Sequence, residues 1–402
     1  IEAFHELLVE RDLDREQEIL SRIIEKYPKE KQAHILMAQS HYMKGQVDEE
    51  IAEYEKVLEL DPREARAYNT LAYIFVVQRD DFDRAMRYLD VYDTLLPGLA
   101  NPVDSRAELL IRAGRFEEAK ALLEKVLEIK HDFPYVGVKL GYCYAMEEDY
   151  TEALKWIDYH ITVSAPKAWK AGGYVMRSYV YQVTGREDLA REDLQTALDI
   201  YALVDNVLGR VGAQWLAGWS HLESGGFGEA RRFFTATLDD PRERFLYSMP
   251  QRPPVIDYDF SLSFSLGMLA VREGDLPGAR TLLSDIDSFM PRIHFQYVDL
   301  ATIYRNMLEA EISISKGDHK RAIELLEVSP RWTIPRFHPS FFVPFIVPYQ
   351  KDLLARAYIH VGEPEKAIAE YEWLISAGPE RELCPLIHPL YHYRLALLYE
   401  EA

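Results

Sequence analysis

Two histidines near the end of the sequence have a spacing that could bind a metal ion. His388 and His392 are four residues apart, and on a helix this spacing can place two imidazoles on one face. The run is His-Pro-Leu-Tyr-His, so it lacks the glutamate of the zinc-protease motif. We therefore predict that both histidines are structural and that the chain has no metal site.

The other reactive side chains also lack the partners that catalysis requires. Cys143 is flanked by two tyrosines inside an expected helix, which is typical of a packing thiol and not of a nucleophile. Acidic pairs such as Glu147-Glu148 and Glu400-Glu401 fall at expected turns or helix ends, where carboxylates are commonly solvated. No base, nucleophile and oxyanion site can be assembled from the sequence. We predict that the chain is not an enzyme and needs no cofactor.

The composition excludes several other classes of function. The formal net charge of −20 opposes binding to nucleic acid or to anionic lipid. Cys143 and Cys384 are the only two cysteines, which gives no disulfide framework and fits a reducing compartment, so we predict a cytoplasmic protein. The longest apolar run, 341–349, is interrupted by prolines and is too short for a membrane helix. Because the sequence opens on Ile1 and stops within a helical pattern, we expect it to be part of a longer chain.

An internal repeat determines the elements that position all these residues. In residues 31–62, apolar residues recur at helical spacing, Gly45 interrupts the pattern, and a second amphipathic run ends at Asp61-Pro62. Glycine suits the end of the first helix because that position often needs a positive φ, and proline cannot continue a helix. The segment therefore predicts a helix, a tight turn, a second helix and a stop.

The same pattern returns about every 34 residues. Small residues recur at the eighth and twentieth positions, where they let paired helices approach closely, and large residues at positions four, eleven and twenty-four fill the gaps. His34 and His41 fall on positions four and eleven, which predicts that they pack between helices. The further copies cover residues 65–97, 100–131, 134–166, 171–202, 211 onward, 260–291, 303–329 and 348–379, with a truncated copy at 388–400.

This repeat resembles the tetratricopeptide family over nearly the whole chain. The resemblance implies an all-α fold: an α-solenoid of about nine helix-turn-helix repeats that forms a right-handed superhelix. The segments 100–105 and 387–392 also resemble arrays that follow bacterial serine/threonine kinase or regulator domains. That narrower resemblance implies a regulatory role within a larger signalling protein.

Two segments break the repeat and set the expected domain boundaries. Residues 241–259 are rich in proline, and residues 330–347 are dense in proline and aromatic side chains. Loops of this length are often functional. They either cover neighbouring helices or form a lip that contacts a partner. The expected organisation is a helix pair with about six repeats in 1–240, the first irregular segment, repeats in 260–329, the second irregular segment, and a final repeat with a truncated one in 348–402.

The resemblance also indicates where a ligand would bind. The first helices of such repeats line a concave groove, into which positions five and nine of each repeat point. These positions do not carry the lysine, asparagine and arginine pattern of family members that clamp a terminal carboxylate. They form a largely aromatic and apolar floor, and tyrosine and tryptophan often anchor interfaces. The candidate partner-binding residues are Asn69, Tyr73, Tyr142, Tyr179, Trp215, Trp219, Phe264 and Met268.

We predict a protein-protein interaction scaffold that holds a segment of a partner protein in this groove. The acidic surface would favour a basic partner. The aromatic floor would alternatively pack on itself or be covered by an irregular segment. Two other functions compete with the scaffold: a regulatory array of a larger signalling protein, and a structural subunit that associates end to end through the solenoid ends.

Overall fold

The computed structural model describes residues 13–237, 258–293, 295–330, 346–376 and 389–401 of the chain. Over these ranges the chain forms twenty α-helices and one short 3-10 helix, Met290–Arg292, and contains no strand. The predicted all-α class is therefore confirmed.

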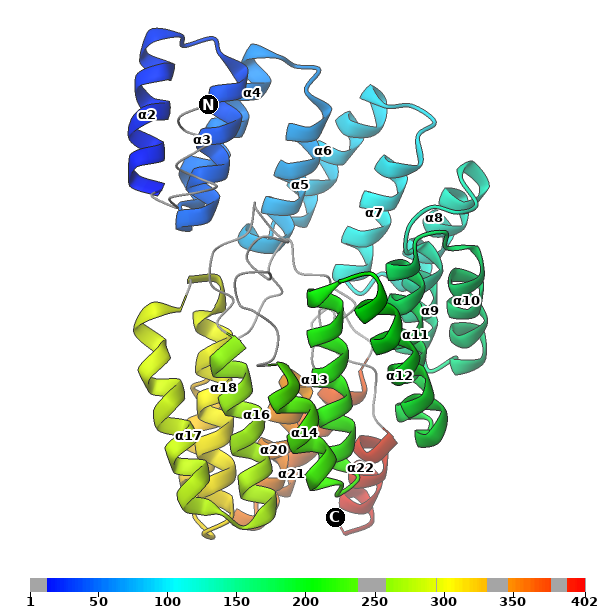
Figure 1. Cartoon of the computed structure of the whole chain (residues 1–402), viewed down its shortest axis with the longest axis vertical. Helices are drawn as coiled ribbons and strands as arrows, with labels where there is room; N and C mark the ends of the chain where they lie inside the picture. Colours follow the sequence, from blue (N-terminus) through cyan, green and yellow to red (C-terminus); the bar gives the residue numbers. More distant parts are fainter. Residues whose placement is uncertain (1–12, 238–257, 294, 331–345, 377–388, 402) are drawn as a thin grey trace.

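The helices follow one another as pairs joined by tight turns (Figure 1). The first helices of the pairs are α3 (Lys31–Lys44), α5 (Ala65–Arg79), α7 (Ala100–Arg112), α9 (Val136–Met146), α11 (Lys167–Val183), α13 (Val207–Glu223), α16 (Tyr258–Glu273), α18 (Phe295–Ile314) and α20 (Ile346–Val361). The second helices are α4 (Val47–Leu60), α6 (Phe82–Leu95), α8 (Phe116–Ile129), α10 (Tyr150–Val163), α12 (Glu187–Leu203), α14 (Phe227–Ala236), α17 (Leu276–Phe289), α19 (His319–Glu327) and α21 (Pro364–Ile375). Helix α2 (Leu13–Lys26) precedes the first pair, and α22 (Pro389–Glu401) follows the last.

The turn inside each pair has the geometry that the sequence predicted. Gly45 ends α3 with a φ of 72°, and its N–H donates to the carbonyls of the last turn of that helix. This left-handed conformation costs a glycine little. Two turns achieve the same conformation without glycine, at Asp80 with φ 51° and at Glu148 with φ 62°.

Close packing within a pair depends on small residues at the eighth position. At Gly218 on α13 there is no room for a side chain, because a Cβ atom would lie 2.4 Å from the ring of Phe234 on α14. The aromatic ring therefore occupies the space that a side chain on α13 would need.

The first helices from α5 to α20 form two runs of neighbouring helices that together build one wall. Helices α5, α7, α9, α11 and α13 are neighbours in that order, and α16, α18 and α20 form a second run. Figure 1 shows α6, α8 and α10 on the outer side of the first run and α17 on the outer side of the second. The two runs join where Trp219 of α13 packs on Phe264 of α16. We call this series of first helices the inner wall.

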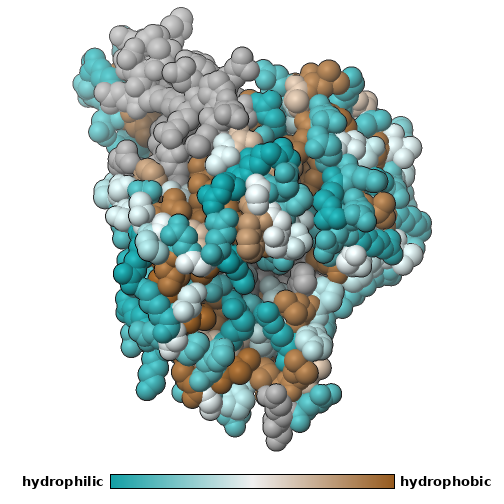
Figure 2. All heavy atoms as spheres, turned by 60° about the horizontal axis from the view of Figure 1, so that its bottom comes forward, coloured by the Kyte–Doolittle hydropathy of each residue, from teal (hydrophilic) through white to brown (hydrophobic). Residues whose placement is uncertain are grey.

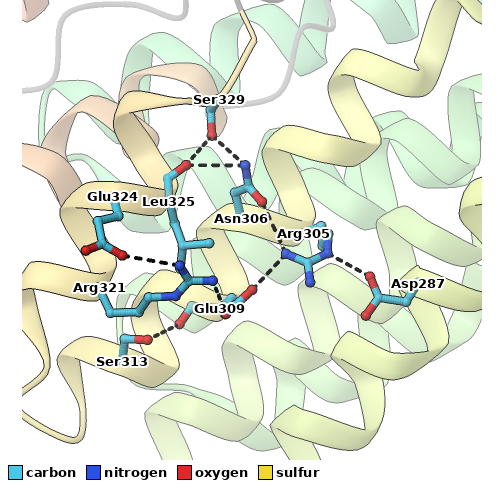
Figure 3. A network of polar contacts seen from close by, with 9 residues as sticks. All are labelled: Asp287, Arg305, Asn306, Glu309, Ser313, Arg321, Glu324, Leu325 and Ser329. Carbon is cyan, nitrogen blue, oxygen red and sulfur yellow. Dashed lines mark hydrogen bonds and ion pairs between the residues drawn. The ribbon is translucent and has the colours of Figure 1, made fainter.

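Polar networks also hold neighbouring helices together. In Figure 3, Arg305 on α18 reaches Asp287 on α17 at 2.7 Å and Glu309 at 2.7 Å. Glu309 in turn accepts from Arg321 on α19, and Asn306 donates to Ser329 at 3.0 Å. Side chains of α18 thus connect this helix to both α17 and α19.

The predicted irregular segments 241–259 and 330–347 lie almost entirely outside the described residues, so the prediction that they cover the groove stays untested. Figure 2 shows the face at the bottom of Figure 1, where hydrophobic side chains form separate patches among hydrophilic ones. None of the described helices is both long and apolar enough to cross a lipid bilayer.

Candidate partner-binding face

All eight predicted groove residues lie on first helices, that is, on the inner wall. Three of them keep part of their surface exposed: Asn69 and Tyr73 on α5, and Trp215 on α13. The side-chain oxygen of Asn69 is buried and has no hydrogen-bond partner. Tyr73 lies beside the carboxylates of Glu108 and Asp104, and burial together with these charges raises its pKa well above the ordinary value.

The other five predicted residues are buried: Tyr142, Tyr179, Trp219, Phe264 and Met268. At these five positions the protein itself covers the predicted aromatic and apolar floor. Whether any of the eight residues contacts a partner stays a prediction.

The ring of Trp219 is covered by other aromatic side chains of the protein. Its ring lies 5.7 Å from the ring of Trp215, 5.7 Å from that of Phe264 and 6.3 Å from that of Tyr349. Trp215 also donates from Nε1 to Ser265 on α16 at 2.9 Å. These contacts match the alternative in which the aromatic residues pack on one another. The indole N–H of Trp219 is buried without a hydrogen-bond partner.

A charged cluster that the sequence did not reveal lies on the first half of the inner wall. Lys139 on α9 is buried and donates to both carboxylate oxygens of Asp104 on α7 at 2.8 Å, and to Glu108 at 3.3 Å. Burial alone would lower the lysine pKa, but the two carboxylates outweigh it and raise the pKa. The one available signal was a lysine within the apolar run of residues 136–146.

A second charged cluster lies on the other half of the inner wall. Arg272 on α16 donates to the hydroxyl of Tyr349 at 2.7 Å, and that hydroxyl donates to Glu311 on α18. Arg356 on α20 donates to Glu311 at 3.1 Å and to Asp352 at 3.1 Å.

This second cluster extends to the last helix of the chain. Arg394 on α22 forms an ion pair with Asp352, which also accepts from the hydroxyl of Tyr371 at 3.0 Å. The network therefore runs through α16, α18, α20 and α22. We call it the C-terminal arginine cluster and define it by Arg272, Glu311, Tyr349, Asp352, Arg356 and Arg394.

His34, His41 and Cys143 have structural surroundings. Nδ1 of His34 lies 2.6 Å from Glu53, and Nδ1 of His41 lies 2.8 Å from the amide oxygen of Gln46. Burial raises the pKa of the Cys143 thiol, which disfavours the reactive thiolate. His388 lies outside the described residues, and within the described ranges no group of three or more metal-ligating side chains occurs.

A family comparison assigns the repeat. Residues 2–65 and 105–168 match the model of the tetratricopeptide repeat. These two stretches are tetratricopeptide repeats. The helix pairs and turns described above continue the same pattern through the other described parts of the chain.

Several solved structures are similar to this chain. A tetratricopeptide repeat protein from Parabacteroides merdae is 14% identical with a TM-score of 0.43, covering 75% of this chain and 98% of its own. YrrB, described as a protein with an unusual peptide-binding site, is 20% identical with a TM-score of 0.32, covering 45% of this chain and 91% of its own. MamA is 18% identical with a TM-score of 0.34, covering 42% of this chain and 97% of its own. None of the curated proteins matches the sequence.

Proposed function

We propose that this protein holds a segment of another protein against its inner wall. Proteins built from tetratricopeptide repeats are in general interaction scaffolds, and the observation that supports a site on the inner wall is its continuity. Within each run the first helices contact one another in series, so a bound segment could touch many repeats at once.

The accessible part of this wall combines aromatic and polar groups. Tyr73 and Trp215 are half-buried, and aromatic residues of this kind supply much of the binding energy in protein interfaces. The buried amide oxygen of Asn69 has no partner, which disfavours the free protein and favours a bound state in which a donor reaches it after a small shift. The net charge of −20 favours basic partner segments through electrostatic steering.

A capture experiment tests this function with a matched pair of variants. The chain is used as bait in the source lysate, next to Trp215→Ala on the inner wall and Tyr159→Ala on α10. Tyr159 is a half-buried aromatic residue on a second helix, so its loss removes a similar ring from the other side of the repeat. A partner that is retained by native chain and Tyr159→Ala but lost with Trp215→Ala supports binding on the inner wall. Equal loss or equal retention in both variants contradicts it.

Self-association is the second candidate function. The last helix, α22, exposes Leu390, Tyr393 and Leu397, which lie at helical spacing on one face. An apolar face of this kind is a common site of assembly between solenoid ends. Light scattering across a range of protein concentrations tests it: a mass that rises with concentration, and falls back with Tyr393→Lys, supports assembly through α22.

A further inference from the structure

His160, near the end of α10, is buried between two neighbouring first helices. The residue is only 2% exposed. Gly137 on α9 and Gly173 on α11 leave space for it, because a Cβ atom on these glycines would lie 2.8 Å and 2.9 Å from side-chain atoms of His160. The imidazole therefore lies where α9, α10 and α11 meet, and it has little room to move unless one of these helices shifts.

Two hydrogen bonds fix the neutral form of the ring. Nε2 lies 2.9 Å from the backbone oxygen of Trp169 on α11, and because a carbonyl oxygen only accepts, Nε2 must carry a proton. Nδ1 lies 3.3 Å from the hydroxyl of Ser164, which can donate to it. Both nitrogens of a neutral imidazole are satisfied in this way, whereas a second proton on Nδ1 would remove its acceptor.

A charged imidazole at this place would have no carboxylate beside it. Helices α9 and α11 contain no aspartate or glutamate. The two carboxylates of α10 are bound to other side chains, Glu152 to Lys155 at 2.9 Å and Asp158 to Arg177 at 2.6 Å. The charged side chains of α9 and α11 are all cations, which would oppose a further positive charge: Lys139, Lys167, Lys170 and Arg177.

Tyr135, which directly precedes α9, stacks on the imidazole. The two rings are 5.5 Å apart with an interplanar angle of 23°, and burial raises the pKa of the Tyr135 hydroxyl, so this neighbour stays neutral in acid. Its backbone has a φ of 60°, which is disfavoured for a residue with a side chain. In the same linker, the carboxylate of Asp132 lies 4.0 Å from Lys130. Because the stack helps to hold Tyr135 in its conformation, a shift of His160 would reach the start of α9.

These surroundings make the neutral form of His160 the one that the folded protein favours. Burial lowers the pKa of His160 below its ordinary value of 6.5, and the hydrogen bond to the Trp169 carbonyl opposes this only in part. The contribution of His160 to stability is therefore fully present above pH 6.5 and is lost as the pH falls through the folded-state pKa. His34 has the opposite surroundings, because its Nδ1 lies 2.6 Å from the carboxylate of Glu53.

We propose that His160 makes the contact between the fourth and fifth repeats sensitive to acid. Protonation would place a charge without a carboxylate between α9, α10 and α11, and separation of these helices would let water reach it. Helices α9 and α11 are neighbours in the inner wall, so the wall would loosen between them. This inference concerns the wall itself and does not depend on whether a partner binds there.

Hydrogen exchange of the native chain tests the proposal. Amide protection, corrected for the intrinsic rates, is measured at pH 8 and pH 5 in α9, α10 and α11, with α5 and α18 as reference helices that contain no histidine. We expect a severalfold loss of protection at pH 5 in the first three helices and a smaller change in the reference helices. Unchanged protection in α9, α10 and α11, or a loss of the same size in all five helices, overturns the proposal.

Two variants assign the response to one histidine. His160→Gln retains a donor for the Trp169 carbonyl but cannot titrate, so the loss at pH 5 should disappear. His131→Gln replaces an exposed histidine in the linker before α9 and should behave as the native chain does. A loss that survives in His160→Gln, or that disappears in His131→Gln, overturns the assignment.

Ser164→Asp tests the missing carboxylate and keeps the histidine. It places a carboxylate where the native chain has a hydroxyl 3.3 Å from Nδ1, so the protonated ring should be stabilised. Protection should then be no lower at pH 5 than at pH 8, and a loss as large as that of the native chain overturns the proposal. Should neither variant fold, the pH dependence in the native chain decides. The loss should begin below about pH 6.5 and then level off, and a loss that begins well above this pH overturns the proposal.

Discussion

Nε2 of His392 lies 2.9 Å from Oε1 of Glu148, although 244 positions separate the two residues in the sequence. Glu148 is in the turn after α9, and His392 is on α22, so the last helix reaches back to the fourth repeat. Both side chains are well exposed, and such a pair contributes only about 0–1 kcal/mol. The contact therefore shows that the last helix lies beside the fourth repeat, but it contributes little to the stability of this arrangement.

Chemical cross-linking should detect this return of the chain. In a chain with Cys384→Ser, the pair Glu148→Cys and His392→Cys should be joined within one molecule by a short bis-maleimide at low protein concentration. The buried Cys143, whose thiol pKa is raised by burial, should not react. The control pair is Tyr27→Cys with Glu148→Cys, because Figure 1 places the end of α2 far from the α9–α10 turn. Equal yields from both pairs would contradict the close approach.

Removing Lys139 should destabilise the first half of the inner wall. Lys139→Met leaves the buried carboxylate of Asp104 without its cation, which costs about 3–5 kcal/mol, whereas Glu108 still has Arg112 at 3.5 Å. Lys155→Met on α10, where the lysine is largely exposed beside Glu152, should cost at most about 1 kcal/mol. Urea unfolding followed by circular dichroism measures both. Adding Asp104→Asn to Lys139→Met should restore part of the loss, and a further loss of similar size would show that the pair does not act through charge.

The fold was predictable from the sequence because the repeat encodes local geometry. The turn at Gly45 needs a positive φ, and the position of Gly218 needs a small residue, and both needs arise within one helix pair. The position of each residue in the repeat is therefore enough to predict them. The burial of Trp219 was not predictable in this way. It depends on contacts with Phe264 and Tyr349, which belong to other repeats far along the sequence.

The same reasoning explains which part of the candidate site the sequence missed. Asp352 and Arg394 are on different repeats, and neither differs from a solvated surface residue when it is considered alone. Their pairing appears only when α20 and α22 are placed side by side. Position within the repeat predicted that all eight candidate residues lie on first helices, which they do, but it carried no information on how far each was covered.

The docking of α2 should weaken as the pH rises, because of one buried carboxyl group. Burial raises the pKa of Glu16 from 4.5 to about 7. Between these two pH values the folded protein retains a proton that the unfolded segment releases. Stability therefore falls by up to about 3 kcal/mol as the pH rises from about 4.5 to about 7, and then levels off.

Hydrogen exchange of the α2 amides at pH 5 and pH 8, corrected for the intrinsic rates, measures this effect. Protection in the native chain should be lower at pH 8. Glu16→Gln should show nearly equal protection at both pH values, whereas Glu18→Gln, an exposed carboxyl on the same helix, should behave as the native chain does. A pH response that persists in Glu16→Gln would assign it to another group.

Two glycines on α13 should respond in opposite directions to the same substitution. Gly218→Ala places a methyl group 2.4 Å from the ring of Phe234, which is buried and cannot move without disturbing Trp219 beside it, so a loss of about 1–3 kcal/mol is expected. Gly212→Ala meets no atom within 4 Å, and alanine is the better helix former by about 0.8–1 kcal/mol, so it should stabilise the protein. Because both changes add one methyl group to one helix, the difference between their urea midpoints isolates the contact between α13 and α14. Equal effects would show that Phe234 can move aside and that the eighth position of this repeat tolerates a larger residue.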